Sequence, residues 1–133
     1  QESVSYYKSP VRTKESMCSG PNYEKGTRVT PSVEFAKGPN AYGEFLGGDV
    51  PLIRIETDLK NGKRAMIVKN SYGNPFSTYL VSHYEQVDVV DYRYFKGSIG
   101  KIIAEDSITD LVFITPTFSA NTLWHVNRMA SIL

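Results

Sequence analysis

The chain has 133 residues, of which 41% are hydrophobic and 22% charged, and its formal net charge is +1. This suits one soluble globular domain with one core, and it excludes a disordered chain. No run of Lys or Arg indicates nucleic acid or an anionic membrane as a partner, and no apolar stretch is long enough to span a bilayer. Cys18 is the only cysteine, so an internal disulfide framework is excluded. No residues have metal-ligand spacing, and we predict neither a metal nor a cofactor.

The first 50 residues differ in texture from the rest. Residues 1–50 are rich in Gly, Pro, Ser, Tyr and Lys, and we predict an irregular, extended segment with short strands at residues 3–7 and 28–35. Pro31 restricts the second of these to the edge of a sheet. Residues 51–133 have the regular patterns of an α/β unit. The two regions form one domain or part of a larger one.

The first strands of the α/β unit are predicted around a tight turn. Residues 52–57 alternate between apolar and polar, which is typical of a strand. Asn61-Gly62 is a strong hairpin signal, so we expect residues 65–69 to return alongside as a central strand.

A helix should follow the turn after residue 69. Asn74 is suited to its N-cap and Pro75 to its first turn. The spacing of apolar residues predicts that one face of this helix packs inward. That face would consist of Phe76, Tyr79, Leu80 and His83 or Tyr84.

Strands and helices alternate through the remaining residues. We predict a strand at residues 87–90, a short helix capped by Ser98, and a buried strand at residues 111–114 ended by Pro116. A terminal helix over residues 121–133 would turn Leu123, Val126, Met129 and Ala130 inward. Short apolar strands alternating with helices favour a mainly parallel sheet in a partial three-layer αβα arrangement. Ligands of such sheets lie beyond the carboxyl ends of the strands.

Ser71 lies at one of these strand ends, directly before the predicted helix. A strand fixes the position of such a serine, and the helix start offers backbone N–H groups that could hold an oxyanion. These features suit acyl chemistry. The same residues, Asn-Ser-Tyr-Gly-Asn-Pro, are also ordinary turn formers, so a structural serine is the alternative.

Two stretches resemble the C-terminal half of the DHHW family, SGNH-hydrolase-like proteins of the bacterial envelope. They are residues 66–76, Met-Ile-Val-Lys-Asn-Ser-Tyr-Gly-Asn-Pro-Phe, and residues 89–95, Val-Val-Asp-Tyr-Arg-Tyr-Phe, with His83-Tyr84 between them. The family pattern has a strand, Lys-Asp-Ser-Tyr-Ala-Asn, a helix with His-Tyr near its end, and a strand entering Asp-x-Arg-Tyr. The resemblance covers about residues 40–120 and implies an SGNH- or flavodoxin-like fold.

The resemblance implies that Ser71 is a nucleophile for O-acyl groups of envelope glycans, in a secreted or envelope protein. The family's partner Asp and His come from an upstream Asp-His motif. This chain has no histidine before Ser71, and Asn70 replaces the family's usual aspartate. Either the chain is the C-terminal part of a longer protein, which we favour, or it has lost the acid–base machinery. The upstream part of the same protein is then an expected partner, together with a carbohydrate or acylated glycan.

Further site residues follow from their positions near the same strand ends. Gly73 and Asn74 are candidates for an oxyanion pocket, although Asn74 is also explained as a helix cap. Tyr72, Arg93 and Tyr94 are candidates for substrate binding. An internal ion pair between Arg93 and Asp91 explains Arg93 equally well. We interpret Lys69 as a solvated strand end.

The chain has two histidines, and neither is well placed by sequence to activate Ser71. His83 follows about three helical turns after it, which favours a packing role. His125 lies late in the chain, as the catalytic histidine of ordinary SGNH hydrolases does, but Thr122 replaces the aspartate three residues before it.

Two functions from different classes therefore stand after the sequence is read. The first is the C-terminal part of a serine esterase or O-acetyltransferase, incomplete or inactive by itself. The second is a non-catalytic carbohydrate-binding or envelope-assembly module with a degenerate SGNH fold. A purely structural role in an envelope complex is a third alternative.

Overall fold

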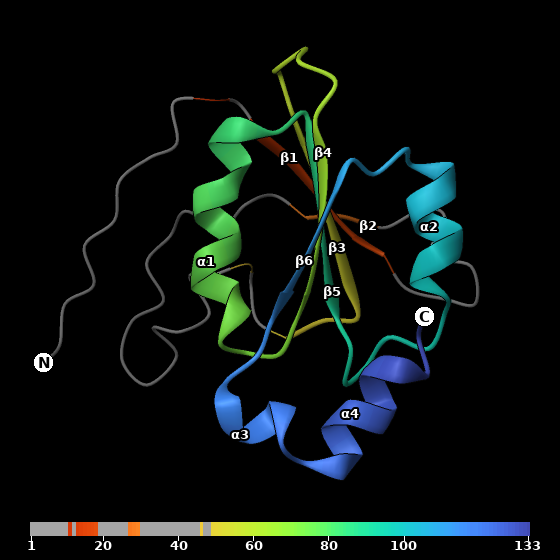
Figure 1. Cartoon of the computed structure of the whole chain (residues 1–133). Coiled ribbons are helices and arrows are strands. Elements are labelled where there is room, and N and C mark those ends of the chain that lie inside the picture. Colours follow the sequence, from red (N-terminus) through yellow and green to blue (C-terminus); the bar gives the residue numbers. More distant parts are fainter. Residues whose placement is uncertain (1–10, 12, 19–26, 30–45, 47–48) are drawn as a thin grey trace, which may run out of the picture.

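A six-stranded sheet with helices on both faces forms the described part of the chain (Figure 1). The structure, a computed structural model, describes residues 11, 13–18, 27–29, 46 and 49–133. The strands are β1 (Thr13–Cys18), β2 (Thr27–Val29), β3 (Leu52–Thr57), β4 (Arg64–Lys69), β5 (Gln86–Asp91) and β6 (Asp110–Ile114). The helices are α1 (Gly73–Leu80), the 3-10 helix η2 (Val81–His83), α2 (Ile99–Glu105), α3 (Thr117–Ala120) and α4 (Leu123–Ala130).

The sheet has a parallel part and an antiparallel part. In the order β2-β1-β3-β5-β4-β6, strand β4 pairs in parallel with both β5 and β6. The pairings of β5 with β3, of β3 with β1 and of β1 with β2 are antiparallel. The predicted α/β class is confirmed, and so is parallel pairing from residue 64 onward. The sheet as a whole is mixed.

The predicted hairpin around Asn61-Gly62 is wrong. Strand β5 lies between β3 and β4, so those two strands do not pair. Gly62 has a φ of 71°, and its N–H donates to Glu85 Oε2 at 3.0 Å, while Asn61 Nδ2 donates to His83 O at 3.0 Å. The turn residues thus bind the loop that leads into β5. Every residue of β5 is buried, which explains why this apolar strand takes the central position.

Helices cover the two faces of the sheet separately (Figure 1). On one face α1 and η2 cover a core that includes Ile67, Val89 and Val81. On the other face Ile99 and Ile102 of α2 pack against a core that includes Met66. Ser98 caps α2 as predicted, accepting a hydrogen bond from the N–H of Lys101 at 3.4 Å. Helices α3 and α4 lie at the carboxyl end of the parallel strands (Figure 1).

The inward face of α1 agrees with the prediction only in part: Leu80 and Tyr84 pack against the core, partly buried. Its buried residues are Gly73, Asn74 and Ser77, whereas Phe76 and Tyr79 are exposed. Ser77 Oγ satisfies itself within the helix by donating to Gly73 O at 2.8 Å. Small residues on this side let the helix approach the sheet closely, which an apolar-periodicity argument does not detect.

The C-terminal elements are less buried than predicted. Strand β6 lies at the edge of the described sheet, and the exposed side chains of Leu111 and Phe113 contradict the predicted buried strand. In α4 only Met129 packs against the core as expected, because Leu123 and Val126 are exposed. Ala130, also predicted to turn inward, is exposed.

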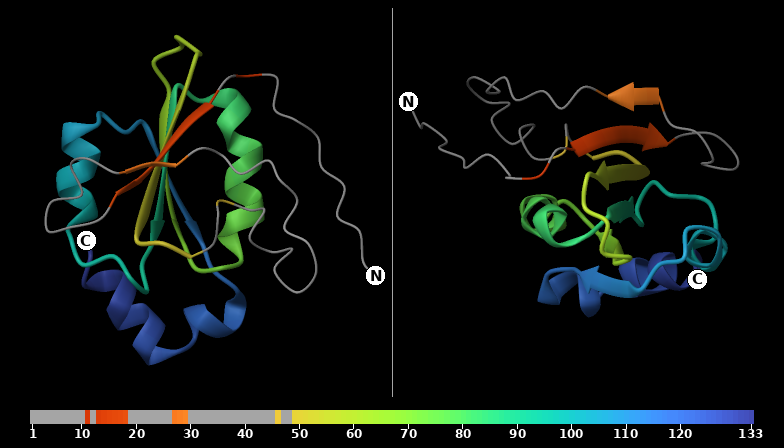
Figure 2. Two further views of the ribbon diagram at one scale, coloured as in Figure 1. Left: turned by 180° about the vertical axis from the view of Figure 1, so that it is seen from behind. Right: turned by 90° about the horizontal axis from the view of Figure 1, so that it is seen from above.

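The N-terminal region contributes β1 and β2 to the antiparallel side of the sheet (Figure 2). The sequence did not predict β1, because Thr-Lys-Glu-Ser-Met-Cys lacks an apolar alternation. Strand β2 coincides with the start of the predicted strand at 28–35, whose remaining residues lie outside the described ones. The predicted strand at 3–7 also lies outside them. The division at residue 50 stays a prediction.

Candidate active site

Ser71 lies in a tight turn between β4 and α1. Strand β4 ends at Lys69 and α1 begins at Gly73, so the turn is only three residues long. Asn70 closes it twice: its Oδ1 accepts from the N–H of Tyr72 at 3.1 Å, and its carbonyl accepts from the N–H of Gly73 at 3.0 Å. Ser71 itself is half-buried. A buried strand and a helix start therefore fix a half-buried serine in space.

Gly73 allows the helix to start directly against the strand. A Cβ atom at this position would lie 2.4 Å from Cβ of Lys69, a distance that real Cβ atoms essentially never show. Helix α1 begins at Gly73, before the predicted N-cap Asn74, and its N-cap position is Tyr72, which makes no side-chain cap hydrogen bond. The prediction of Asn74 as the cap is therefore wrong. Because Asn70 closes the turn and Gly73 has no side chain, the helix begins at Gly73, earlier in the sequence than predicted.

The donors predicted for an oxyanion pocket have partners within the protein. The N–H of Gly73 donates to Asn70 O, and the N–H of Asn74 donates to Ser71 O at 3.2 Å. The side chain of Asn74 is fully buried, and its Nδ2 donates to Asp49 Oδ1 at 3.0 Å. Asn74 Oδ1 is buried without a hydrogen-bond partner. An oxyanion bound at this turn would compete with these internal contacts.

Four charged side chains form a cluster behind the turn, in which Lys69 and Asp91 are buried and Arg93 and Asp49 are partly accessible. Lys69 Nζ lies 2.9 Å from Asp91 Oδ2 and 3.4 Å from Asp49 Oδ1. Arg93 Nη2 lies 2.6 Å from Asp91 Oδ2 and 2.7 Å from Asp49 Oδ2. The two cations and two carboxylates balance, which is how buried charge is stabilised. Lys69 is almost completely buried, so its interpretation as a solvated strand end is wrong.

The charges of the cluster perturb one another. Partial burial works against ionisation of Asp49, but hydrogen bonds from Arg93 and Asn74 and the positive charges of Lys69 and Arg93 outweigh it. The pKa of Asp49 is therefore below its ordinary value. Hydrogen bonds to Asp91 and Asp49 raise the pKa of Arg93. Both shifts favour the charged forms of Asp49 and Arg93 at neutral pH.

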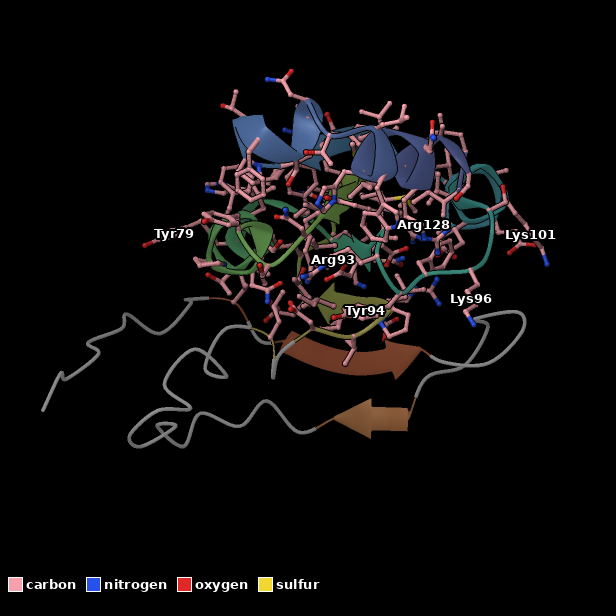
Figure 3. The ribbon with its side chains drawn as sticks, turned by 90° about the horizontal axis from the view of Figure 1, so that it is seen from below. Tyr79, Arg93, Tyr94, Lys96, Lys101 and Arg128 are labelled. Carbon is pink, nitrogen blue, oxygen red and sulfur yellow. The ribbon has the colours of Figure 1, made fainter. Side chains whose placement is uncertain are left out.

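Arg93 is held by this cluster, as the ion-pair alternative proposed. Its Nε donates to Asp91 Oδ1 at 2.9 Å, and its guanidinium carbon lies 5.1 Å from the ring centroid of Tyr94. Figure 3 views the carboxyl end of the parallel strands and shows Arg93 and Tyr94 there. Tyr94 remains about half exposed. The internal pairing of Arg93 and Asp91 is confirmed, and binding of a substrate by Arg93 or Tyr94 stays a prediction.

A second polar network links the turn to α3 and α4. Asn70 Nδ2 donates to Ser119 Oγ at 3.3 Å, and both residues are buried. The hydroxyl of buried Tyr92 shares a hydrogen bond with His125 Nδ1 at 2.8 Å. Burial raises the pKa of Tyr92, against the opposite effect of hydrogen bonds with Ser119 and Asn70. Asn70 is therefore both the clamp of the Ser71 turn and a connection to the terminal helices.

Aromatic rings line the surface beside this network. Tyr72 and Phe118 meet edge to face with ring centroids 6.4 Å apart, and Phe118 contacts His125 in the same way at 6.5 Å. Trp124 packs against His125 with centroids 4.8 Å apart. Tyr72, Phe118 and Trp124 are each more than half exposed. The turn of Ser71 thus adjoins an open aromatic surface.

The two histidines have different surroundings. His83 ends η2, ten residues after Gly73, so it lies about 15 Å from the turn along the helix. His125 is held by Tyr92 among aromatic rings, which sequence reasoning did not predict. The described part of the chain brings together no group of three or more His, Cys, Asp or Glu side chains that could hold a metal ion.

Sequence reasoning missed Asp49, Tyr92 and Ser119 as parts of the site. The sequence did contain a signal for the ion cluster, because Lys69 and Asp91 each lie at the end of a predicted strand. In the structure these two residues are register partners in the parallel pair of β4 and β5. Two opposite charges at such strand ends predict a pair. Ser119 carries no such signal, because the path of α3 over the turn is not visible in local sequence.

The fold is similar to that of longer solved proteins. No family model matches the chain, and neither does a curated protein. The crystal structure of a DHHW family protein from Eubacterium siraeum matches with a TM-score of 0.75 and 28% identity, over 92% of this chain and 41% of that one. The predicted resemblance to a DHHW family protein is thus confirmed as a structural similarity.

PatB1 of Bacillus cereus is a second similar structure, solved with and without a sulfonyl adduct. The two structures match with a TM-score of 0.58 at 20% and 21% identity. Each covers 80% of this chain, which corresponds to 36% and 35% of the PatB1 chains. At this identity the likeness concerns the fold alone. The chain spans less than half the length of the solved proteins that it matches.

Proposed function

We propose that this chain is the Ser71-bearing C-terminal part of an SGNH-like serine esterase or O-acetyltransferase acting on cell-envelope glycans. The observation that carries the proposal is the partly accessible Ser71 in the tight turn between buried β4 and α1. The proposed place of action is the bacterial cell envelope or the exterior. The partner that completes the site is the upstream part of the same protein.

Two similarities support this assignment. The DHHW family protein matches nearly the whole chain. The resemblance of the sequence to this family implies that Ser71 is the nucleophile. PatB1 shares the fold and was solved with a sulfonyl adduct, so a protein of this fold reacts covalently with such a group. Sulfonyl reagents are accordingly a direct probe of Ser71.

In the proposed reaction the Ser71 hydroxyl oxygen attacks the acyl carbonyl carbon of an O-acylated sugar. A base takes the hydroxyl proton, the carbon–oxygen bond to the sugar breaks, and the sugar oxygen regains a proton. Water, or the hydroxyl of another sugar, then removes the acyl group from Ser71. Backbone N–H groups of the turn would hold the oxyanion, with Gly73 the proposed donor.

The base is proposed to come from polypeptide outside these residues. His83 lies at the far end of α1, and His125 Nδ1 is engaged with Tyr92. A serine without a base is a weak nucleophile, so the chain alone should turn over acyl esters slowly or not at all.

The test is p-nitrophenyl acetate hydrolysis by the longer protein, compared with its Ser71→Ala variant. We expect loss of activity by about a thousandfold or more, since the covalent route is removed. Ser82→Ala is the matched control, because Ser82 is equally half-buried and its hydroxyl donates only within α1 and η2, to Tyr79 O at 3.4 Å. Labelling by phenylmethylsulfonyl fluoride should map to residue 71. Equal rates for the parent and Ser71→Ala would remove Ser71 from the mechanism.

A non-catalytic glycan-binding module is the second candidate, and the exposed rings beside the turn favour it. Aromatic faces stack on sugars, and Tyr72, Phe118 and Trp124 offer three of them. The internal partners of Gly73 and Asn74 also fit a site that binds without reacting. Retention of an acetylated glycan by this chain, lost in Trp124→Ala, with no hydrolysis by any longer form, would support this alternative.

A further inference from the structure

Strand β6 ends the described sheet with an apolar side uncovered. It pairs with β4 alone among the described strands. Leu111 and Phe113, which alternate along β6, are 43% and 45% exposed. Their register partners on β4 are Met66 and Val68, which are completely buried in the core under α2. The hydrophobic layer of this face therefore continues outward onto β6 and stops in solvent.

Edge strands of finished sheets are usually protected against pairing with another strand. Charged side chains on the strand, a proline within it, or a covering helix or loop provide this protection. Strand β6 has one charged residue, Asp110, at its start, but Leu111 and Phe113 present large apolar groups along it. No described element lies beyond the strand in Figure 1 or in the right view of Figure 2. Helices α1 and α2 lie over the two faces of the sheet and leave this edge uncovered.

Helix α4 also has exposed apolar side chains. Met129 packs against the core, whereas Leu123 and Val126, three residues apart on one face, are 73% and 42% exposed. A helix that is apolar on two sides is typical of one buried on both. One apolar side of α4 thus lacks a covering element in the described part of the chain.

The solved DHHW family protein is longer than this chain, which offers a source of polypeptide to cover such surfaces. It matches 92% of this chain but only 41% of its own length, so more than half of that chain lies outside the matched region. The PatB1 structures have a similar excess. We infer that β6 is an internal strand in the complete protein, where a strand from polypeptide outside these 133 residues pairs with it and covers Leu111 and Phe113.

The chemistry of this partner strand follows from the surface. It should carry alternating apolar residues on the side that continues the layer of Met66 and Val68. A strand from the same polypeptide has a high effective concentration, which favours it over a second copy of the chain. The inference concerns assembly of the sheet and does not depend on catalysis by Ser71.

Hydrogen exchange of the β6 amides tests the inference. Residues 110–114 should exchange about tenfold or more faster in the isolated 133-residue chain than in the complete protein, because a partner strand adds hydrogen bonds along the edge. In the complete protein Phe113→Lys should lower the melting temperature by several degrees. In the isolated chain the same substitution should have little effect, since half of this side chain already lies in solvent.

Tyr79→Lys is the matched control, because it also places a charge on an exposed aromatic position, 75% accessible and away from β6 on α1. It should be neutral in both forms. Equal exchange of the β6 amides in both forms, or a neutral Phe113→Lys in the complete protein, would overturn the inference. A reading frame that encodes nothing beyond these residues would overturn it too. Protection of β6 that rises with concentration of the isolated chain, together with a dimer by light scattering, would replace the proposed strand with a second copy.

Discussion

Asp88 should make the stability of this fold depend on pH. The residue is completely buried in the central strand β5. Its Oδ1 accepts from Arg54 Nε at 3.2 Å and from Gln86 Nε2 at 3.0 Å, whereas its Oδ2 has no donor. Its neighbour Asp106 is itself paired with Arg54. Asp106 also raises the pKa of Asp88 through a side-chain hydrogen bond. Two ionised carboxylates cannot form this bond because both only accept, so one of them must carry a proton.

Burial raises the pKa of Asp88 from 3.8 to about 7, with the charge of Arg54 opposing the rise and Asp106 adding to it. Each pKa unit corresponds to about 1.4 kcal/mol, so the ionised carboxylate costs the folded chain about 4 kcal/mol. In the unfolded chain Asp88 ionises near pH 4, and in the folded chain near pH 7. Between these values the folded state holds the extra proton. The free energy of unfolding should therefore fall as pH rises through this window and level off above it.

Asp88→Asn tests this reasoning directly. The amide oxygen can accept from Arg54 and Gln86, and the amide nitrogen can donate to Asp106 without ionising. We expect urea denaturation to show similar stabilities for parent and variant near about pH 4, and a more stable variant at about pH 8, by as much as about 4 kcal/mol. The titration of groups away from Asp88 cancels in this difference. Asp110→Asn, which removes an exposed carboxylate from β6, controls for net charge. A difference that does not change with pH would refute the reasoning.

Two further substitutions test the scaffold of the Ser71 turn, and a third tests the cap of α2. Gly73→Ala places a Cβ against Lys69 and should cost about 1–3 kcal/mol in thermal unfolding, more than Gly100→Ala, whose nearest contact would be 3.3 Å. Lys69→Met leaves the buried Asp91 carboxylate with Arg93 as the one remaining cation of the cluster and should lower the free energy of unfolding by about 3 kcal/mol. Adding Asp91→Asn to this variant should restore part of the lost stability. Strictly additive effects of the two substitutions in a double-mutant cycle would contradict the pairing. Ser98→Ala removes the cap of α2 and should cost about 1 kcal/mol by urea denaturation, with an unchanged midpoint as the contrary result.

Sequence patterns predicted the parallel part of this fold because its strands contain short apolar stretches and alternate with helices. The pattern failed where spatial neighbours decide the outcome. Asn61-Gly62 has the composition of a hairpin turn, yet β5 separates the two strands, and the turn binds Glu85 and His83 instead. The composition of a turn predicts its backbone conformation, but it does not predict whether the two strands that it connects pair with each other.

The position of Ser71 could be predicted from the sequence, whereas the buried charges that hold its turn could not. Ser71, the strand before it and the helix after it follow from a short sequence, since an apolar run, an Asx residue and a Gly-Asn-Pro start are local signals. The buried role of Lys69 was missed because a charged residue at a strand end is usually solvated. Its burial depends on Asp49 and Asp91, which come from two other segments of the chain.

The mispredicted surfaces point in one direction. The residues predicted to be inward but found exposed are Phe76, Tyr79, Leu111, Phe113, Leu123, Val126 and Ala130. An amphipathic pattern reflects which residues are buried in the complete protein. Where the apolar side of such a pattern is exposed, a neighbouring element outside these residues is a better explanation than a wrongly assigned helix or strand period. The elements with such residues include β6 and α4, which are the elements inferred to be completed by polypeptide outside these residues. The same polypeptide is proposed to supply the base that Ser71 needs. One missing segment would therefore account for both the open edge of the sheet and the incomplete chemistry of the turn.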